Sequence, residues 1–495
     1  MTGITARDPR TGRIDWEGTA ADPAEIGEVA ARLRAAQPVW EARGSAARLE
    51  TLRAFGQALA RHAGPIGAAL EVDTGRRRIA RLEIDSVIGS IEGWARIIAQ
   101  VTPPDWIAGR GLAGVRHTSA WKAYPLVGVI SPWNFPILLG MIDAIPALLA
   151  GCAVMVKPSE VTPRFIAPVM AAIAEVADLA EVFSIMVGDG ATGQAIVSAA
   201  DCVCFTGSVA TGRKVAIQAA GRLIPAYLEL GGKDPLIVLE GADIERATDA
   251  ALRGSVLSTG QACQSIERIY VHRSIHDAFL SRLVAKAAAV QLNWPDIGSG
   301  QVGPIIFARQ AEILAAQIDD ARQRGARVLT GGQIETHGGG LWLRPTVIGD
   351  VTSDMAVMQD ETFGPVMPVM AFDTADQAVK LANDGEYGLS AAVFGPTLEA
   401  AEAVGRRLEA GAISLNDAAL TSIFYEAAKQ AFKASGLGPS RMGEDGYRRF
   451  LRRQAIIANT LAPLPLTAFS EEGLTGNDDP SALQSCTPPR GLNTC

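Results

Sequence analysis

The chain has 495 residues, enough for two or three domains of about 100–200 residues each. Hydrophobic residues make up 48% of it and charged residues 20%, so large cores can form and global disorder is excluded. The net charge is −8 and no long run of Lys and Arg occurs, which argues against a nucleic acid as partner.

The six cysteines suggest neither a disulfide framework nor a metal site. No two of them are spaced as CxxC, and Cys202 and Cys204 stand in an apolar, strand-like run. This usage is typical of a reduced, cytoplasmic protein, and no bound metal is expected. Residues 1–16 carry several charges, so we expect no signal peptide there.

The early chain favours helices, and one later apolar segment resembles a membrane span. The helices are predicted at Pro23–Gln37, Ala46–His62 and Ile79–Ala99. Residues 105–123 are Gly-rich, with aromatic and charged residues, and predict a hairpin outside the main alternation. Segment 136–156 is long and apolar enough to span a membrane, but Asp143, Pro146 and Gly151 interrupt it. We therefore predict a buried helix followed by a buried strand, and no span.

From residue 126 onward, strands and helices alternate in two series, which predicts two α/β domains with mainly parallel sheets covered on both faces. Thr162 is predicted to cap a helix that has Pro163 at its first position. The chain after about Leu466 is predicted to be a disordered tail. The predicted strands are Leu126–Ser131, Ala153–Val156, Phe183–Val187, Cys202–Phe205, Ile224–Leu230, Pro235–Leu239, Ile266–Val271, Ala326–Leu329, Val366–Phe372, Ala391–Phe394 and Ala412–Leu415, and the later helices are Ile244–Leu257, Ile275–Val290 and Ala308–Arg324.

Cys263 stands in a small-residue loop just before a predicted strand. A cysteine is a nucleophile only as thiolate, so it needs access and a low pKa, and the loop Gly260-Gln261-Ala262-Cys263 offers access. Glu229 ends a predicted strand and is followed by two glycines, where it could act as base for the cysteine or for a water. Taken alone, Cys263 could equally be a small buried apolar residue.

Two further motifs follow predicted strands and could hold a nucleotide. The stretch 205–212, with Gly207 and Ser208, is a Gly-rich turn that could place backbone N–H groups at a pyrophosphate, although it lacks the GxGxxG pattern and could be a plain tight turn. Lys157 and Glu160, three residues apart, could hydrogen-bond ribose hydroxyls or form a solvated pair.

Two more motifs have polar and aromatic residues close together. In Ser131-Pro132-Trp133-Asn134-Phe135-Pro136, the amide of Asn134 could donate to an oxyanion, or the segment could be a rigid turn. In Asp360-Glu361-Thr362-Phe363, a carboxylate and an aromatic ring two residues apart could hold a ribose and flank a flat ring, or belong to a capped loop.

In this order and spacing, the motifs resemble those of the aldehyde dehydrogenase superfamily, of the NAD(P)-dependent, non-acylating kind, over residues 8–460. The resemblance implies Cys263 as nucleophile, Glu229 as general base activating a water, and Asn134 with the Cys263 backbone N–H as oxyanion hole. A family asparagine near the substrate loop matches Asn416. The residues that would bind the cofactor are Ser131, Trp133, Lys157, Glu160, Gly207, Ser208, Gly231, Glu361 and Phe363.

The resemblance also implies a domain plan. A Rossmann-like cofactor domain would take residues 1–104 and 124–231, and a second α/β catalytic domain residues 232–434. A small β oligomerisation element at 105–123 and 435–466 would make a homodimer or homotetramer, and 467–495 would be the tail. The stretch 436–443 departs from the usual family pattern, which leaves the subfamily and the subunit count open.

Substrate residues are predicted from the same resemblance. The helix after Asn134 offers Leu138, Leu139 and Ile142, the late loop offers Ile423, Phe424 and Tyr425, and Gln264, unusual for the family, is placed at the entrance. This mostly apolar set predicts an apolar aliphatic or aromatic aldehyde. A semialdehyde with a charged tail and a catalytically silent binding protein are the alternatives. Glu160 would repel a 2′-phosphate, so NAD is expected rather than NADP.

Overall fold

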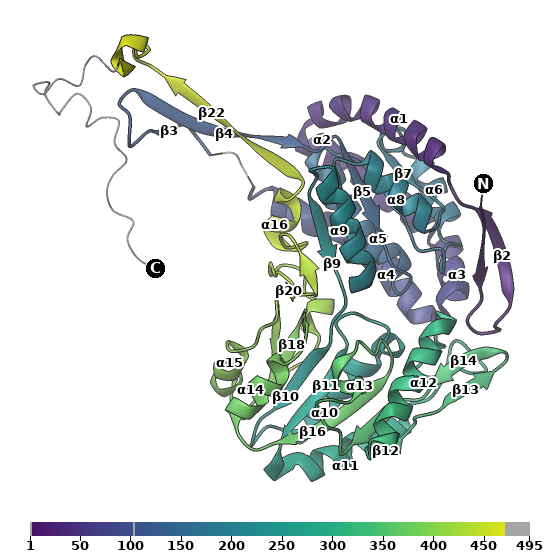
Figure 1. The fold of residues 1–495 in the computed structure, drawn as a ribbon. Coiled ribbons are helices and arrows are strands. Elements are labelled where there is room, and N and C mark those ends of the chain that lie inside the picture. Colours follow the sequence, from purple (N-terminus) through teal and green to yellow (C-terminus); the bar gives the residue numbers. More distant parts are fainter. Residues whose placement is uncertain (1, 102–103, 471–495) are drawn as a thin grey trace, which may run out of the picture.

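The computed structural model describes residues 2–101 and 104–470. The chain forms two α/β bodies and a long β extension (Figure 1). The predicted disordered tail lies mostly outside the described residues. Within its described part, the turn η3 (Leu466–Phe469) is a short 3-10 helix.

The first body contains a six-stranded sheet in the order β21-β9-β8-β5-β6-β7. Neighbouring strands are parallel except β21, which runs antiparallel to β9. Every residue of β5, β6 and β8 is buried, as expected for central parallel strands that helices cover on both faces. The strands are β5 (Leu126–Ile130), β6 (Ala153–Lys157), β7 (Phe183–Ile185), β8 (Cys202–Thr206), β9 (Ala226–Glu229) and β21 (Gly436–Leu437).

Most of the helices predicted for this body are confirmed, but the predicted start of one helix is not. The predicted start at Thr162 is wrong, because α6 begins at Ile166. The Thr162 side chain is fully buried and its hydroxyl donates to the Trp133 carbonyl oxygen at 3.4 Å, so it does not cap a helix. The helices are α1 (Pro23–Ala42), α2 (Gly44–Arg61), α3 (Ala63–Thr74), α4 (Arg77–Ile98), α5 (Pro136–Ala150), α6 (Ile166–Ala174), α7 (Ala177–Ala180), α8 (Gly190–Ala199), α9 (Val209–Gly221) and α16 (Gly443–Arg448).

The second body is built on a seven-stranded sheet in the order β12-β15-β16-β11-β10-β18-β19. Only β12 is antiparallel to its neighbour in this sheet, so the predicted parallel α/β class is confirmed. Its strands are β10 (Asp234–Val238), β11 (Ile266–His272), β12 (Arg327–Thr330), β15 (Thr346–Gly349), β16 (Val366–Phe372), β18 (Ala391–Phe394) and β19 (Ile413–Leu415). The helices are α10 (Ile244–Val256), α11 (Arg273–Ala289), α12 (Ala308–Gln323), α13 (Ala356–Gln359), α14 (Ala375–Asn383) and α15 (Leu398–Gly405).

Short elements complete this part of the chain. A hairpin that was not predicted, β1 (Gly3–Arg7) with β2 (Ile14–Thr19), reaches the second body, where Arg7 donates to the carbonyl oxygens of Ile305 and Ile306. The others are η1 (Leu257–Gly260), β13 (Ile334–His337), β14 (Gly340–Leu343), β17 (Tyr387–Gly388), η2 (Leu420–Ser422) and β20 (Phe432–Lys433).

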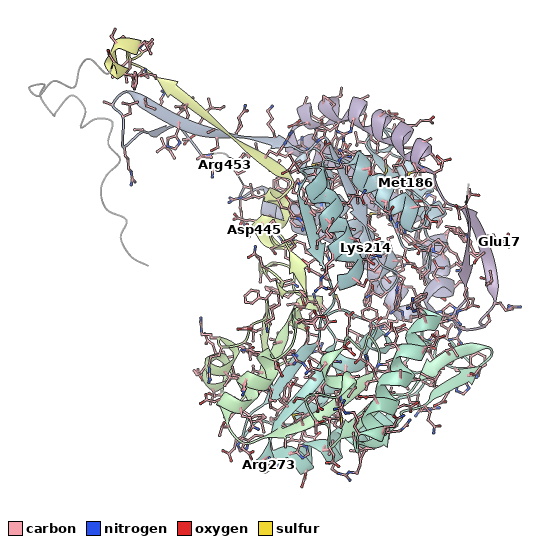
Figure 2. All side chains as sticks on the ribbon, in the orientation of Figure 1. Glu17, Met186, Lys214, Arg273, Asp445 and Arg453 are labelled. Atoms are coloured by element: carbon pink, nitrogen blue, oxygen red, sulfur yellow. The ribbon has the colours of Figure 1, made fainter. Side chains whose placement is uncertain are left out.

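The β extension projects from the first body (Figure 1). It consists of β22 (Leu451–Asn459), β4 (Val115–Ala123) and β3 (Ile107–Ala108), in that order and antiparallel. The β3–β4 pair confirms the predicted hairpin. Figure 2 shows Arg453 on this ribbon, and its Nε donates to Ser119 Oγ across the strands at 2.9 Å. Residues 436–450 include β21 and α16, which pack on the first body instead.

The apolar segment 136–156 is α5 followed by β6, as predicted. Within the described ranges, we find no helix with both the length and the hydropathy of a membrane span. Asp143 is buried on α5, where it accepts hydrogen bonds from Arg441 at 2.6 Å and from Arg449. Burial alone would raise the pKa of Asp143, but the charges and hydrogen bonds of the two arginines outweigh it and hold the pKa below its usual value.

Asp143→Ala is expected to lower the free energy of unfolding by about 3–5 kcal/mol, because two arginines would remain buried without a counterion. Urea denaturation followed by circular dichroism would measure it. Asp85→Ala, which breaks the exposed pair with Arg81 (3.1 Å), is the matched control and should cost less than about 1 kcal/mol. Equal losses in both variants would contradict the role assigned to Asp143.

Candidate active site

A cavity of about 900 Å³ opens at the carboxyl ends of β5, β6, β8 and β9. In a parallel sheet these ends meet at one edge, which is where open α/β sheets bind ligands. The structure brings together at this cavity all the residues predicted to be catalytic or to bind the cofactor. They are Ser131, Trp133, Asn134, Lys157, Glu160, Gly207, Ser208, Glu229, Gly231, Cys263, Glu361 and Phe363.

Cys263 lies on the loop that joins η1 to β11. Two glycines, Gly260 on this loop and Gly232 on a neighbouring segment, let other backbone segments pack tightly against it. Gly260 has φ +65°, and a Cβ there would lie 2.3 Å from the carbonyl carbon of Gly364. A Cβ at Gly232 would lie 2.3 Å from the Cys263 carbonyl oxygen. The thiol residue is only half-buried, unlike the fully enclosed Cys152, Cys202 and Cys204. Cys263 therefore differs from the alternative considered above, in which it would be a small, fully buried apolar residue.

The Cys263 thiol is strongly biased toward its neutral form. Burial raises its pKa to about 12, the charge of Lys429 lowers it, and the charges of Glu229, Glu361 and Asp234 raise it further. In the protein alone, the thiolate is therefore a minor species at neutral pH. A proton acceptor or an added positive charge in the cavity is needed to populate it.

Asn134 holds its amide against the cysteine loop. Its Nδ2 donates to the Gln261 carbonyl oxygen at 2.9 Å, and Arg76 donates to the Asn134 carbonyl oxygen at 2.5 Å. One amide hydrogen remains for another acceptor, since an asparagine amide has two. The arrangement fixes a donor against the cysteine loop before substrate arrives, and an oxyanion hole requires a donor fixed in this way.

Glu229 stands at the end of β9, on the same cavity wall. Its backbone is held on both sides, because it pairs with Gly436 of β21 and its carbonyl oxygen accepts from the Gly207 N–H at 3.1 Å. The side chain is half-buried, so water can reach the carboxylate. A base at this place can accept a proton from the thiol or from a water.

The other end of the cavity has nucleotide-binding features. Lys157 Nζ donates to Glu160 Oε2 at 2.8 Å, so the pair is already formed. Ser208 caps α9 by accepting from the Thr211 N–H at 3.3 Å, and a Cβ at Gly207 would lie 2.6 Å from the Phe205 ring, so only glycine leaves the turn open.

Aromatic and acidic groups line the cavity nearer Cys263. Trp133 and Phe363 meet edge to face with ring centroids 5.2 Å apart. Glu361 Oε1 accepts from the Gly232 N–H at 3.2 Å. Burial, with the nearby charge of Glu267, raises the pKa of Glu361 to about 8.

A buried ion pair, missed from the sequence, positions the loop that carries Glu361 and Phe363. Glu267 on β11 accepts from the backbone N–H groups of Thr362 (2.7 Å) and Phe363 (2.8 Å). Lys233 Nζ donates to Glu267 at 3.0 Å and to the Thr362 hydroxyl at 2.6 Å. Lys233 follows Glu229 by four residues and Glu267 follows Cys263 by four, but only their tertiary pairing reveals the role.

Most of the residues predicted to contact substrate lie outside the lining of this cavity, and Leu139 is the exception. Leu138 is half-buried and packs on the first core, while its neighbour Leu139 lines the cavity. Gln264 accepts from the Thr421 hydroxyl at 2.5 Å, which ties the cysteine loop to the late loop. Ile142 is half-buried and Phe424 is exposed. Asn416 accepts from the Gly395 N–H at 2.9 Å. The substrate roles of these residues stay predictions.

Several cavity residues were not predicted. Asp189 and Gly190 begin α8, and the sequence signal for them was only the Gly-rich turn after β7. Lys214 on α9, labelled in Figure 2, also lines the cavity. Phe307 packs near Trp133, with ring centroids 6.1 Å apart, and Gln310 Nε2 donates to the Thr362 carbonyl oxygen at 2.7 Å.

Comparison with known proteins identifies the family to which this site belongs. The sequence model that describes the aldehyde dehydrogenase family matches residues 2–456 of this chain. The chain belongs to the aldehyde dehydrogenase family. The aldehyde dehydrogenase fold, with α/β bodies on mainly parallel sheets, is therefore confirmed, and the chain is an NAD(P)-dependent enzyme that oxidises an aldehyde to an acid.

Similar aldehyde dehydrogenases carry different substrate names. A protein of Mycolicibacterium smegmatis named "Putative succinate-semialdehyde dehydrogenase [NADP(+)]" is 35% identical over 90% of this chain and 86% of its own length. The Anabaena variabilis structure named "Putative Aldehyde Dehydrogenase PutA" is 49% identical, with a TM-score of 0.92 over 94% of this chain and 99% of that one. Lactaldehyde dehydrogenase from Escherichia coli is 30% identical, with a TM-score of 0.88 over 93% and 96%.

Proposed function

We propose that this aldehyde dehydrogenase works through a covalent thioester on Cys263, with Asn134 and Glu229 in the roles predicted from the sequence and with NAD as cofactor. The observation that carries the proposal is the convergence of these three residues on the one cavity that also collects the predicted nucleotide-binding residues. Nucleophile, donor and base side by side are the requirement for acyl transfer through a thiol.

The residues divide the chemistry between them. The Cys263 thiolate attacks the aldehyde carbon, and the Asn134 amide and the Cys263 backbone N–H donate to the oxyanion that forms. Loss of hydride from that adduct leaves a thioester on Cys263. Glu229 then takes a proton from a water, which hydrolyses the thioester to the carboxylic acid and frees the thiol. When bound, NAD supplies the hydride acceptor.

The cavity fits this cofactor. Its wall includes the N-terminal turn of α9, where backbone N–H groups could bind a pyrophosphate. The wall also includes Ser131, which follows β5 and whose hydroxyl is buried without a hydrogen-bond partner. Lys157 and Glu160 would hold the adenosine ribose, and Glu361 the nicotinamide ribose beside Phe363. The Glu160 carboxylate would repel a 2′-phosphate, which favours NAD over NADP.

Glu160→Gln is expected to narrow the preference for NAD over NADP by roughly tenfold in kcat/KM, because the amide keeps a hydrogen bond but removes the negative charge. Initial rates with both cofactors would measure it. Glu181→Gln, an exposed residue away from the cavity, is the control. An unchanged ratio in Glu160→Gln would show that another residue sets the preference.

Two substrate classes and a subunit arrangement complete the proposal. The mostly apolar residues predicted from the sequence to contact substrate support an apolar aldehyde, and the buried cation Lys429 favours the alternative, a semialdehyde with a charged tail. The β extension, which exposes Ile456 and Ile457, supports a homodimer or homotetramer. A free catalytic thiol suits a reducing compartment such as the cytoplasm.

The test is a panel of apolar and charged aldehydes with NAD and NADP, followed by the absorbance of the reduced cofactor. Turnover of at least one aldehyde with NAD supports the proposal. A folded protein that binds NAD and turns over no aldehyde would instead support the catalytically silent binding protein.

A further inference from the structure

Lys429 is a buried cation without a hydrogen-bond partner. It lies in the loop between η2 and β20, is 7% exposed, and its Nζ is among the buried polar atoms that no protein group satisfies. Its backbone is fixed, because the Lys429 N–H donates to Ser440 Oγ at 2.9 Å. Burying an ammonium group without a partner costs free energy, so a specific use is expected for it.

The other buried lysines of the described chain are paired. Lys233 donates to Glu267 at 3.0 Å, and Lys157 donates to Glu160 at 2.8 Å. The charge of Lys429 lowers the pKa of Asp234, but Asp234 accepts its hydrogen bonds from the backbone N–H and the hydroxyl of Ser390. Burial also raises the pKa of Asp234 to about 7, so it is not a permanent counterion.

Lys429 is close enough to the reacting sulfur for its charge to act on the thiol. Its loop begins at the 3-10 turn η2, where the Thr421 hydroxyl donates to Gln264, the residue that follows Cys263. Among the charges around Cys263, that of Lys429 has the largest effect on the thiol and is the one that lowers its pKa. An unsatisfied ammonium group is therefore held within electrostatic reach of the thiol.

We propose that Lys429 binds a carboxylate on the aldehyde substrate, so that this enzyme takes short semialdehydes whose anionic group lies a few bonds from the carbonyl. The proposal rests on the proposed function. The substrate carboxylate would supply the missing partner of the ammonium and orient the aldehyde carbon toward Cys263. The product is then a dicarboxylate. This favours the charged-tail alternative over the apolar aldehyde.

Two thiol reagents of nearly the same shape test the anion site without any turnover. Iodoacetate carries a carboxylate where iodoacetamide carries a neutral amide, and peptide mass spectrometry resolves alkylation at Cys263 from that at other cysteines. We expect the ratio of the iodoacetate rate to the iodoacetamide rate to exceed that of glutathione by roughly tenfold. It should fall by roughly tenfold in Lys429→Met and persist in Lys429→Arg.

The controls separate anion binding from a general effect on the thiol. If Lys429 only stabilises the thiolate, Lys429→Met slows both reagents alike and the ratio is unchanged, which would overturn the proposal. Lys433→Met, on the same segment but paired with Glu409 at 2.8 Å, should keep the wild-type ratio. Should Lys429→Met fail to fold, the comparison of wild type with glutathione decides by itself, since equal ratios contradict an anion site.

Turnover gives the second measurement. Succinate semialdehyde is butanal with a carboxylate in place of the terminal methyl group. The ratio of their kcat/KM values should favour the semialdehyde in wild type and fall by roughly tenfold or more in Lys429→Met. A wild type that prefers butanal would refute the anion site and leave the dehydrogenase proposal standing. Selective iodoacetate alkylation without turnover of any aldehyde would support the anion site and contradict the dehydrogenase proposal.

Discussion

Cys263→Ala is expected to lower aldehyde turnover by about four orders of magnitude or more, because no other cysteine is among the described residues that line the cavity and could form the thioester. Binding of NAD should persist, since Cys263 is not among the residues proposed to hold the nucleotide. Reduced-cofactor formation and a separate titration of cofactor fluorescence would measure the two properties in one preparation.

Cys152→Ala is the matched control for this loss. Cys152 is fully buried between α5 and β6, away from the cavity, and burial raises its pKa to well above the usual value, so it has no path to the substrate. It should retain most of the activity. A Cys263→Ala variant with more than about one hundredth of the wild-type rate would show that the thiol is not the nucleophile.

Glu229→Gln is expected to stop the reaction after its first half. Glutamine keeps the size of the side chain but cannot accept a proton, so hydrolysis of the thioester should slow by about two to four orders of magnitude. One equivalent of reduced cofactor per active site should form rapidly, followed by very slow turnover. Rapid-quench kinetics would measure the burst, and mass spectrometry would detect the acyl group on Cys263.

The same experiment separates the two roles that Glu229 could have. A base that served only the thiol would, when removed, slow the first half of the reaction and abolish the burst. Removing its negative charge should also ease ionisation of Cys263, because that charge raises the pKa of the thiol. Glu240→Gln, on the exposed end of the loop after β10, is the control and should show normal turnover.

The predicted strands and helices agree best with the structure where consecutive residues are all buried. The runs of β5, β6 and β8 carry no charged or hydroxyl-bearing residue before their last position and are buried throughout, so their strand identity and central place follow from composition alone. The start of α6 was mispredicted because threonine before proline is typical of a helix N-cap. In the structure the Thr162 hydroxyl instead donates to the Trp133 carbonyl oxygen. The helix α3 and the first hairpin were missed because their patterns are short and weak.

The sequence by itself located the predicted cavity residues of the first body, among them Ser131, Lys157, Gly207 and Glu229. Each of these four stands at or just after the end of a strand, and parallel strands bring their carboxyl ends to one edge whatever the details of packing. Only the tertiary structure decided how charges are paired. Lys233 with Glu267, and Asp143 with Arg441, are separated by 34 and 298 residues. No local spacing encodes these pairs, and for the same reason only the fold shows that the Lys429 ammonium group is buried without a hydrogen-bond partner.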